Sequence, residues 1–249
     1  MTAPVYYFDL GNTRAKFWRC EEGRVVGHWA AVHAGQPGQL LGALPEGFGD
    51  PAAAVLGISV LDPAAEARFA SAVQQKWTVA PEFARAGASF GQIRNAYRDD
   101  PSRLGIDRWI GLIGGAGDCD VLCVVGCGTA ITIDVLDGAA HKGGYILPGL
   151  RLMQGALLAG TQKVRFDEGT PCSASLGTST AEAVRNAAVA AVVALVERVV
   201  ASERVDRLVL TGGDADLVAP LLAVPCEVDA GLLLKGMMRY FAHRNGSPA

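Results

Sequence analysis

A strand, a glycine turn and a second strand follow one another twice in this chain, at almost the same spacing. In the first copy an apolar segment leads into the turn at Gly11, and in the second a similar segment leads into Gly128, 117 residues later. The next turn glycines, Gly23 and Gly138, are 115 residues apart. Because a repeated unit of this kind is most simply explained by a duplicated fold, the sequence predicts two halves of similar build.

We place the boundary between these halves near residue 116, which gives an N-terminal half of residues 1–116 and a C-terminal half of residues 117–249. Each half is expected to open with an antiparallel meander whose strands are joined by tight glycine turns. Strands are expected at residues 5–9, 14–20, 24–30, 53–59, 121–125, 130–135, 145–147 and 208–210, and helices at residues 63–77, 180–200 and 232–240. This mixture of elements in both halves indicates an α/β fold.

The charges of the chain are balanced and interspersed. The chain has 22 basic and 25 acidic residues, for a net charge of −3. A protein that binds a phosphate backbone or an anionic membrane surface by charge needs a concentration of basic residues, and this sequence has none. Neither nucleic acid nor a membrane is therefore expected as a partner.

Three further features favour a cytoplasmic protein. The longest unbroken apolar segment, residues 187–196, has ten residues, whereas a helix that crosses a bilayer needs about 20. The N-terminal residues lack the charged and then apolar pattern of a secretory signal. The six cysteines lack the dense spacing of a small secreted scaffold, so we expect reduced thiols that act as small core residues.

The first glycine turn combines a carboxylate with a loop whose backbone N–H groups can face outward. Asp9 stands at the end of a strand, shortly before Gly11, Asn12 and Thr13. A backbone nest of this kind binds phosphate, and an acidic side chain beside it can hold Mg²⁺ through water. Taken alone, the same pattern also describes an ordinary hairpin turn.

Two more glycine turns strengthen the phosphate interpretation. Residues 126–130, Gly-Cys-Gly-Thr-Ala, stand in the second copy where residues 9–13 stand in the first, so the two nests are expected to face each other and grip one polyphosphate. Residues 211–214, Thr-Gly-Gly-Asp, follow a buried strand, where glycines let a planar ligand approach the backbone, although a simple strand-to-helix turn has the same pattern. The Walker-A and Rossmann spacings are missing, which disfavours those nucleotide folds.

Five ordered motifs together resemble the type III pantothenate kinase family, which lies within the sugar kinase, Hsp70 and actin superfamily. The three glycine turns are similar to its two phosphate motifs and its adenosine motif. Residues 104–108 match the family signature Leu-Gly-x-Asp-Arg, and residues 143–149 match Gly-Gly-x-Ile-x-Pro-Gly. The resemblance covers nearly the whole chain, and residues 32–85 are its least informative part.

This resemblance implies both a fold and a reaction. The fold would consist of two ribonuclease-H-like halves, as in actin-like ATPases, with mixed sheets flanked by helices, and the protein would be a homodimer. The reaction would transfer the γ-phosphoryl group of ATP, with Mg²⁺, to the primary hydroxyl of pantothenate. Its product would be 4′-phosphopantothenate, in the first step of coenzyme A biosynthesis.

The resemblance also assigns site residues, position by position. Those implied to bind ATP are Asp9, Leu10, Gly11, Asn12, Thr13, Arg14, Ala15, Lys16 and Thr129. Asp9 is in addition the candidate to hold Mg²⁺ through phosphate and water. Those implied to bind pantothenate are Tyr97, Gly105, Ile106, Asp107, Arg108 and Thr180. Among them, Asp107 resembles the general base and Tyr97 closes on the substrate.

The chemistry of phosphoryl transfer agrees with these residue types. The reaction depends on positioning and on neutralisation of charge, so nests, Mg²⁺ and one carboxylate near the attacking hydroxyl suffice, without a Cys or His nucleophile. Adjacent residues on a helix do not face each other, so a mere surface ion pair with Arg108 explains Asp107 less well than a functional role. Arg108 can pair with a substrate carboxylate in a planar fork, or it can be structural.

The second phosphate motif departs from the family pattern at its first residue. In many family members this residue is an aspartate that helps to bind a monovalent cation such as K⁺, whereas this chain has Gly126. Glycine supplies no side-chain oxygen, and Asp134 on the following strand is not expected to replace the missing carboxylate. We therefore expect activity with ATP and Mg²⁺ that does not require K⁺ or ammonium.

Two alternatives to the kinase remain open on these motifs. The chain could be a nucleotide-binding accessory or regulatory factor of the same family with little turnover. It could also have another activity of the superfamily, such as that of a polyphosphate phosphatase or a sugar kinase, although residues 104–108 are not expected in those proteins. Production of ADP from ATP with pantothenate, with sugars and with no acceptor would separate the three.

Some residues carry structural expectations only. The helix at residues 180–200 has a wide apolar face of alanines and valines, which we expect to be buried within the fold or between subunits, with this helix at the dimer interface. Cysteines at 119, 123 and 127 are four residues apart, which along a strand is too far for one zinc ion, so core thiols are the better interpretation. The histidines at 28, 33, 141 and 243 show no ligand spacing.

Overall fold

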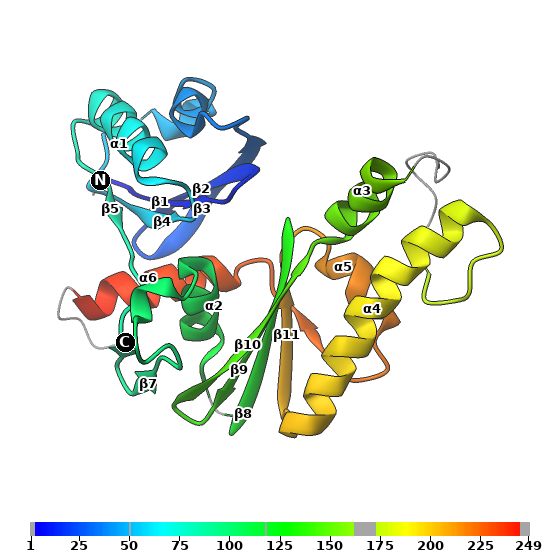
Figure 1. Ribbon diagram of the computed structural model, residues 1–249. Coiled ribbons are helices and arrows are strands. Elements are labelled where there is room, and N and C mark those ends of the chain that lie inside the picture. Colours follow the sequence, from blue (N-terminus) through cyan, green and yellow to red (C-terminus); the bar gives the residue numbers. More distant parts are fainter. Residues whose placement is uncertain (1–2, 50, 118, 162–172, 245–249) are drawn as a thin grey trace. The chain divides into compact units, whose positions relative to one another are not determined.

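The computed structural model describes residues 3–49, 51–117, 119–161 and 173–244 of the chain. The chain folds into two compact units, each built on one mixed β-sheet (Figure 1). Of the described residues, unit 1 contains those up to 87, residues 100–110 and those from 233 onward, and unit 2 contains residues 88–99 and 111–232. The α/β class and the two mixed sheets agree with the expectation from the sequence.

Unit 1 has a five-stranded sheet in the order β3-β2-β1-β4-β5. Its strands are β1 (Val5–Leu10), β2 (Arg14–Glu21), β3 (Arg24–Val32), β4 (Ala54–Ser59) and β5 (Glu82–Phe83). The first three form the expected antiparallel meander. The chain then returns to pair β4 in parallel with β1, and β5 in parallel with β4.

Unit 2 repeats this arrangement. Its strands are β6 (Ser89–Phe90), β7 (Ile93–Arg94), β8 (Val121–Cys127), β9 (Ala130–Asp137), β10 (Ala140–Pro148), β11 (Arg207–Thr211) and β12 (Glu227–Val228). They form a sheet in the order β12-β11-β8-β9-β10-β7-β6, in which β8, β9 and β10 are antiparallel neighbours and β11 is parallel to β8. The run β10-β9-β8-β11-β12 reproduces β3-β2-β1-β4-β5, so the duplication expected from the glycine spacing is confirmed.

Helices pack against both sheets. The α-helices are α1 (Pro63–Trp77), α2 (Ile106–Gly115), α3 (Leu150–Gly160), α4 (Thr180–Glu203), α5 (Ala215–Val218) and α6 (Leu232–Arg244). The 3₁₀ turns are η1 (Pro37–Gly42), η2 (Glu46–Phe48), η3 (Pro101–Arg103) and η4 (Ala219–Leu221). Among the described residues, no helix combines the length and the apolar character that crossing a membrane requires.

In unit 1, alternation along β1 directs side chains to two helices. Tyr6 stacks on Trp77 of α1, with ring centroids 4.6 Å apart. Tyr7 points to the other side of the sheet, where its ring lies 6.5 Å from that of Phe241 in α6. Because successive strand residues face opposite sides, α1 and α6 cover the two faces of the same sheet.

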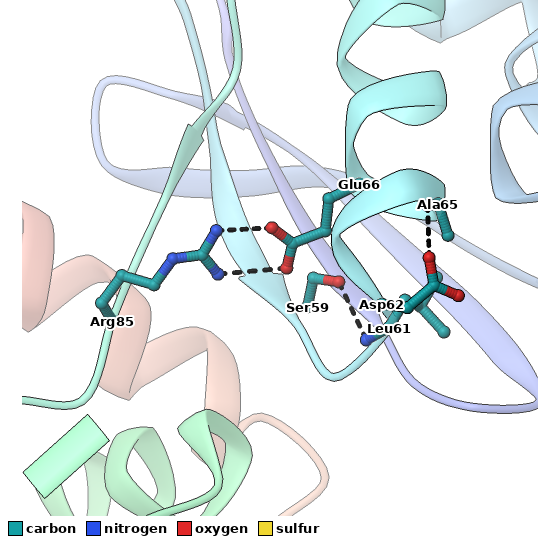
Figure 2. A network of polar contacts seen from close by, with 6 residues as sticks. All are labelled: Ser59, Leu61, Asp62, Ala65, Glu66 and Arg85. Atoms are coloured by element: carbon teal, nitrogen blue, oxygen red, sulfur yellow. Dashed lines mark hydrogen bonds and ion pairs between the residues drawn. The ribbon is translucent and has the colours of Figure 1, made fainter. Parts of the chain in front are cut away.

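One arginine, shortly after β5, contacts both α1 and α6 in unit 1, and Figure 2 shows its contact with α1. The Arg85 guanidinium donates to both carboxylate oxygens of Glu66 in α1, at 3.1 and 2.5 Å. The backbone of Arg85 also exchanges hydrogen bonds with the Tyr240 hydroxyl of α6, at 3.2 and 3.1 Å. At the start of α1, Pro63 occupies the first turn and the Asp62 carboxylate accepts from the Ala65 N–H at 2.8 Å, as a helix start of this type predicts.

In unit 2, the long helix α4 divides its small apolar residues between two sides. Most of its valines are buried in one core with Ile131 and Ile133 of β9; they are Val189, Val192, Val193, Val196 and Val199. The alanines at 183, 187, 191 and 194 are exposed. The expected single apolar face is therefore two faces, because at 3.6 residues per turn the valines and these alanines point in different directions.

The two units do not correspond to consecutive halves of the chain, which corrects the expected boundary near residue 116. The segment before α2 joins the sheet of unit 2, where Arg94 of β7 pairs with Ala140 of β10. Conversely, α6 from residue 233 onward belongs to unit 1. Strand pairing and apolar packing are long-range contacts, and they assign these two segments against their order in the sequence.

The cysteines of the described residues are free thiols. Cys123 and Cys127 are fully buried in β8, within the core that contains α4. Burial raises the pKa of each of these thiols to about 12. Both therefore act as small core residues, as expected.

Candidate active site

The turn between β1 and β2 is the first element of the site. Asp9 and Lys16 are direct cross-strand partners, and the Lys16 ammonium lies 3.4 Å from the Asp9 carboxylate. The Gly11 N–H donates to the Arg14 carbonyl at 3.0 Å, which closes the turn. Residues 12–14 are exposed, so the tip of this expected phosphate motif is open to a ligand.

The residues that flank the turn anchor it in the core. Leu10 and Ala15 are completely buried, so of the expected ATP-binding residues these two offer only backbone atoms. The Leu10 carbonyl accepts from the Val60 N–H at 3.0 Å, directly after β4. The carboxyl end of β4 thus holds the base of the turn in place.

The Asp9 carboxylate is in an unusual electrostatic position for an aspartate. It is buried, and burial raises its pKa above the ordinary value, while the nearby Lys16 ammonium opposes that shift. The negative charge of Asp107 raises the pKa of Asp9 further. Unit 1 therefore brings two carboxylates from the predicted site within electrostatic range of each other, from positions almost a hundred residues apart in sequence.

A histidine that sequence reasoning set aside supports the same turn. His33, at the end of β3, is buried, and its Nε2 lies 2.8 Å from the Gly11 carbonyl oxygen. Its Nδ1 accepts from the Gly35 N–H at 3.1 Å, so Nε2 carries the proton and donates to Gly11. The His33 backbone N–H also donates to the Thr13 carbonyl at 3.2 Å. A lone histidine carries no spacing signal, so only the fold reveals this contact.

Asp107 lies in the first turn of α2. The helix opens with a hydrogen bond from the Trp109 N–H to the Gly105 carbonyl at 3.0 Å. A Cβ added at Gly105 would lie 2.7 Å from Asp107 Oδ1, so the carboxylate rests against the glycine and would have to shift if a side chain were added there. Ile106 and Arg108 have buried side chains. Gly105, Ile106, Asp107 and Arg108 thus form one compact turn at the start of α2. The Asp107 carboxylate lies over this helix start.

The helix that carries Asp107 is held closely by α6. A Cβ at Gly236 of α6 would collide with the Ile110 carbonyl oxygen of α2. Glycine at 236 therefore permits α2 and α6 to approach each other at backbone distance. The position of the Asp107 turn depends on this contact as well as on its own sequence.

The second phosphate motif is the turn between β8 and β9 in unit 2. The Gly128 N–H donates to the Ala130 carbonyl at 3.1 Å, and Thr129 is exposed at the tip. The Gly149 N–H donates to the Thr129 carbonyl at 2.9 Å, and a Cβ at Gly149 would collide with the backbone of this turn. The last glycine of the motif at residues 143–149 therefore serves to pack that motif against the turn.

The third glycine turn lies beside the second in the same unit. Thr211 at the end of β11 pairs with Gly126 of β8. Gly212 has a φ of +103°, and a Cβ there would collide with the Cys127 carbonyl oxygen. The Cys127 carbonyl in turn accepts from the Asp214 N–H at 3.1 Å. Three of the five sequence motifs, residues 126–130, 143–149 and 211–214, thus meet at one end of the strands in unit 2.

The remaining expected pantothenate residues also lie in unit 2. Tyr97 follows β7, and its ring is parallel to that of His141, with centroids 6.3 Å apart and an interplanar angle of 15°. Thr180 is exposed as the first residue of α4, directly after the N-cap Ser179. Unlike Gly105, Ile106, Asp107 and Arg108, which are in unit 1, these two side chains are carried by the second sheet and its helices.

The start of α4 is shaped by a capping box. The Ser179 hydroxyl accepts from the Glu182 N–H at 3.2 Å, and the Glu182 carboxylate accepts from the N–H and hydroxyl of Thr178 at 2.7 and 2.9 Å. These hydrogen bonds lower the pKa of Glu182. The box fixes the backbone on both sides of Thr180 and leaves its side chain exposed.

The donor set suits a metal ion that is shared with a ligand. Among the described residues there is no cluster of three or more His, Cys, Asp or Glu side chains that could hold a metal. Mg²⁺ is commonly bound through one or two carboxylates together with substrate phosphates. The buried Asp9 carboxylate beside the exposed turn is a donor of this kind, so the residues present fit Mg²⁺ bound with a nucleotide.

Comparison with known sequences agrees with the motifs. The sequence profile of the type III pantothenate kinase family matches residues 6–202. A type III pantothenate kinase from Psychrobacter arcticus is 34% identical over 245 residues, which cover 98% of this chain and 100% of that protein. One from Acinetobacter baumannii is 35% identical over 240 residues, which cover 95% of this chain and 97% of that protein.

Comparison with solved structures agrees with the fold. A protein from Campylobacter jejuni, described as a conserved Baf family transcriptional activator, aligns with a TM-score of 0.65 at 19% identity over 97% of this chain and 99% of its own. MreB 5 of Spiroplasma citri, solved bound to AMPPNP, aligns with a TM-score of 0.55 at 8% identity over 99% and 98%. At these identities the likeness concerns the fold alone. The profile match and the full-length identity carry the assignment: this chain belongs to the type III pantothenate kinase family.

Proposed function

We propose that this chain transfers the γ-phosphoryl group of ATP to the primary hydroxyl of pantothenate and forms 4′-phosphopantothenate, the first step of coenzyme A biosynthesis. Membership of the family over nearly the full length carries this conclusion. The presence of Asp9 and Asp107 in one unit, close enough for the charge of Asp107 to raise the pKa of Asp9, supports it at the level of the site.

The nucleotide is bound by the glycine turns. The exposed turn after Asp9 offers backbone N–H groups and the side chains of residues 12–14 to the phosphates, and Lys16 adds a positive charge next to them. Thr129 at the tip of the second turn adds a phosphate contact, and the turn at residues 211–214 accepts the adenosine. Mg²⁺, held by Asp9 with the phosphates, would neutralise negative charge on the transferring group.

The acceptor is activated by Asp107. Its carboxylate takes the proton of the pantothenate hydroxyl as the hydroxyl oxygen bonds to the γ-phosphorus and the bond from that phosphorus to the β-phosphate oxygen breaks. ADP is the leaving group. In this proposal Gly105, Ile106 and Arg108 surround the substrate, and the Arg108 guanidinium pairs with the pantothenate carboxylate. Tyr97 and Thr180 contribute the remaining contacts.

The function is tested by following ADP production from ATP and Mg²⁺ in parallel reactions with pantothenate, with hexose sugars and without an acceptor. We expect turnover that depends on pantothenate, with one 4′-phosphopantothenate formed for each ADP. Turnover with sugars would indicate a sugar kinase, and equal turnover without an acceptor would indicate a nucleotidase. Nucleotide binding without any turnover would support an accessory factor.

The protein acts as a homodimer in this proposal. The exposed alanine row of α4 supports this arrangement, because small side chains let a second subunit approach the helix closely. Leu152 and Leu157 of the neighbouring helix α3 are exposed by 51% and 45% and are further candidates for the interface. A cytoplasmic location and independence from K⁺ and ammonium complete the proposal.

A further inference from the structure

We infer that His141, held by Asp134, is a positioning residue for Tyr97. The inference rests on the proposed function, because Tyr97 has its role at pantothenate there. His141 lies near the start of β10, outside all five sequence motifs. All residues concerned belong to unit 2.

A buried carboxylate fixes one edge of the imidazole. His141 Nε2 lies 3.0 Å from Asp134 Oδ1, and the two side chains are 0% and 2% exposed. Asp134 is on β9, the antiparallel neighbour of β10. A buried carboxylate is costly without a hydrogen-bond donor, so Asp134 and His141 hold each other in one place between two paired strands.

The other edge and the face of the imidazole reach the segment that carries Tyr97. His141 Nδ1 accepts from the Ala96 N–H at 3.4 Å, so the ring proton is on Nε2 and is donated to Asp134. The Tyr97 ring is stacked parallel to the imidazole at 6.3 Å. One side chain thus connects the buried carboxylate with both the backbone and the ring of the segment.

This contact lies where strand pairing has ended. Strand β7 pairs with β10 at Arg94, whose N–H also donates to the Ala139 carbonyl at 2.8 Å. Beyond Arg94, the Asn95 carbonyl oxygen Oδ1 accepts from the Tyr97 N–H at 2.9 Å, and Asn95 is buried. Asn95 and His141 therefore direct the backbone at Tyr97, and the His141 imidazole also stacks with its ring.

Loss of His141 should weaken the binding of pantothenate and not that of ATP. Loss of the imidazole releases the Tyr97 segment from Asp134 and leaves the ATP turns and the Asp107 turn unchanged in their own contacts. Binding of pantothenate is then weakened equally before and during the reaction. Such a loss raises KM for pantothenate while kcat and KM for ATP change little.

The first experiment compares His141→Ala with His141→Asn in the full-length protein. For His141→Ala we expect KM for pantothenate to rise about tenfold, with kcat within about threefold and KM for ATP within about twofold of wild type. The Asn side chain can offer its carbonyl oxygen to the Ala96 N–H, so His141→Asn should recover part of the loss. Val135→Ala is the control, because Val135 neighbours Asp134 in sequence but lies in the core with α4. It should lower stability without changing KM for pantothenate.

A double-mutant cycle tests whether His141 acts through Tyr97. In a Tyr97→Ala background, His141→Ala should raise KM for pantothenate by less than about twofold, because coupled residues are not additive. Full additivity would overturn the inference. So would an unchanged KM in His141→Ala, or equal effects on the KM values of both substrates.

Amide hydrogen exchange provides a measurement that needs no substrate. In the free protein, His141→Ala should speed exchange at Ala96 and Tyr97, while exchange in β1 and β2 stays as in wild type. If the wild type proves inactive towards pantothenate, the proposed function fails, and the exchange experiment alone decides whether His141 holds the Tyr97 segment. Unchanged exchange at these two amides would contradict that role.

Discussion

The hydroxyl of Thr132 occupies the space in which a side chain on Gly126 would begin. The two residues are cross-strand partners in β8 and β9, and a Cβ added at Gly126 would lie 2.6 Å from Thr132 Oγ1. Gly126 stands in the second sheet where Asp9 stands in the first, next to last in the strand that leads into the glycine turn. The duplicated fold has thus kept the turn and replaced the carboxylate with glycine in the second copy.

This pair predicts how the enzyme responds to monovalent cations. Without a carboxylate at Gly126, we expect the initial rate in a K⁺-free and ammonium-free Tris buffer to rise little when either salt is added at constant ionic strength. Activation of about tenfold or more would mean that other oxygen atoms complete a cation site. Gly126→Asp combined with Thr132→Ala, which clears the space for the new side chain, should gain dependence on K⁺. Thr132→Ala alone is the control and should not.

Replacement of Asp107, the proposed general base, should remove activity and leave the fold intact. Asp107→Asn is expected to lower kcat by about 10²- to 10⁴-fold, the usual contribution of a positioned base. The rate is measured with both substrates saturating, and the thermal midpoint reports folding. Asp62→Asn is a matched control, since asparagine caps a helix as well as aspartate does and Asp62 caps α1. A kcat of Asp107→Asn within about threefold of wild type would exclude Asp107 as the base.

The contact between Gly105 and Asp107 predicts that a change at Gly105 lowers activity even though the Asp107 carboxylate is still present. In Gly105→Ala the new Cβ would lie 2.7 Å from Asp107 Oδ1, so the carboxylate must move. Because small displacements of a reacting group cost about 10²-fold, we expect a large fall in kcat measured with both substrates saturating. Gly42→Ala, also in unit 1, makes no new contact within 4 Å and needs no positive φ, so it serves as the comparison. Wild-type kcat in Gly105→Ala would show that the carboxylate does not need this position.

The raised pKa of Asp9 predicts that this residue costs stability at neutral pH. Its folded-state pKa is raised, chiefly by burial, so the stability it contributes is present below its ordinary pKa and is lost as the pH rises through the raised value. Asp9→Asn should therefore unfold in urea at an equal or higher midpoint than wild type at pH 8, and the difference should shrink towards pH 4. The same variant should lose phosphoryl transfer, because Asn cannot neutralise a cation.

A control separates this effect from a general change in net charge. Asp120→Asn removes one exposed carboxylate and serves as the control for the change in net charge over the same range. A urea midpoint for Asp9→Asn that falls well below wild type at pH 8 would show that the ion pair with Lys16 outweighs the cost of burial.

The exposed alanine row predicts the effect of a charge on assembly. Wild type should have the mass of a dimer by light scattering at assay concentrations, and Ala187→Arg on α4 should shift it towards the monomer, because a buried arginine without a partner is costly at an interface. Ala67→Arg places the same charge on the exposed side of α1 and should leave the dimer intact. A monomeric wild type, or a dimeric Ala187→Arg, would contradict this interface.

Local signals in the sequence were sufficient for many elements. The glycine turns, the apolar runs of β1 and β8 and the Asp-Pro start of α1 are short-range features, and the structure places these elements within one or two residues of the expected bounds. The helix α3 and the short strands β5, β6 and β7 were not expected. A two-residue strand has no periodicity of its own, so β7 exists only because Arg94 can pair with Ala140.

The sequence by itself indicated the duplicated plan and the glycine turns, because turn chemistry, apolar periodicity and motif spacing are local properties. The residues proposed to bind phosphate and to take a proton came from the resemblance of these motifs to the family. Only the tertiary structure decided that residues 88–99 belong to unit 2 and that α6 closes unit 1. It also placed His33 against Gly11 and His141 against Asp134. The sequence around each of these residues does not identify its partner. A buried polar group needs a hydrogen bond, but the fold decides which group lies close enough to provide it.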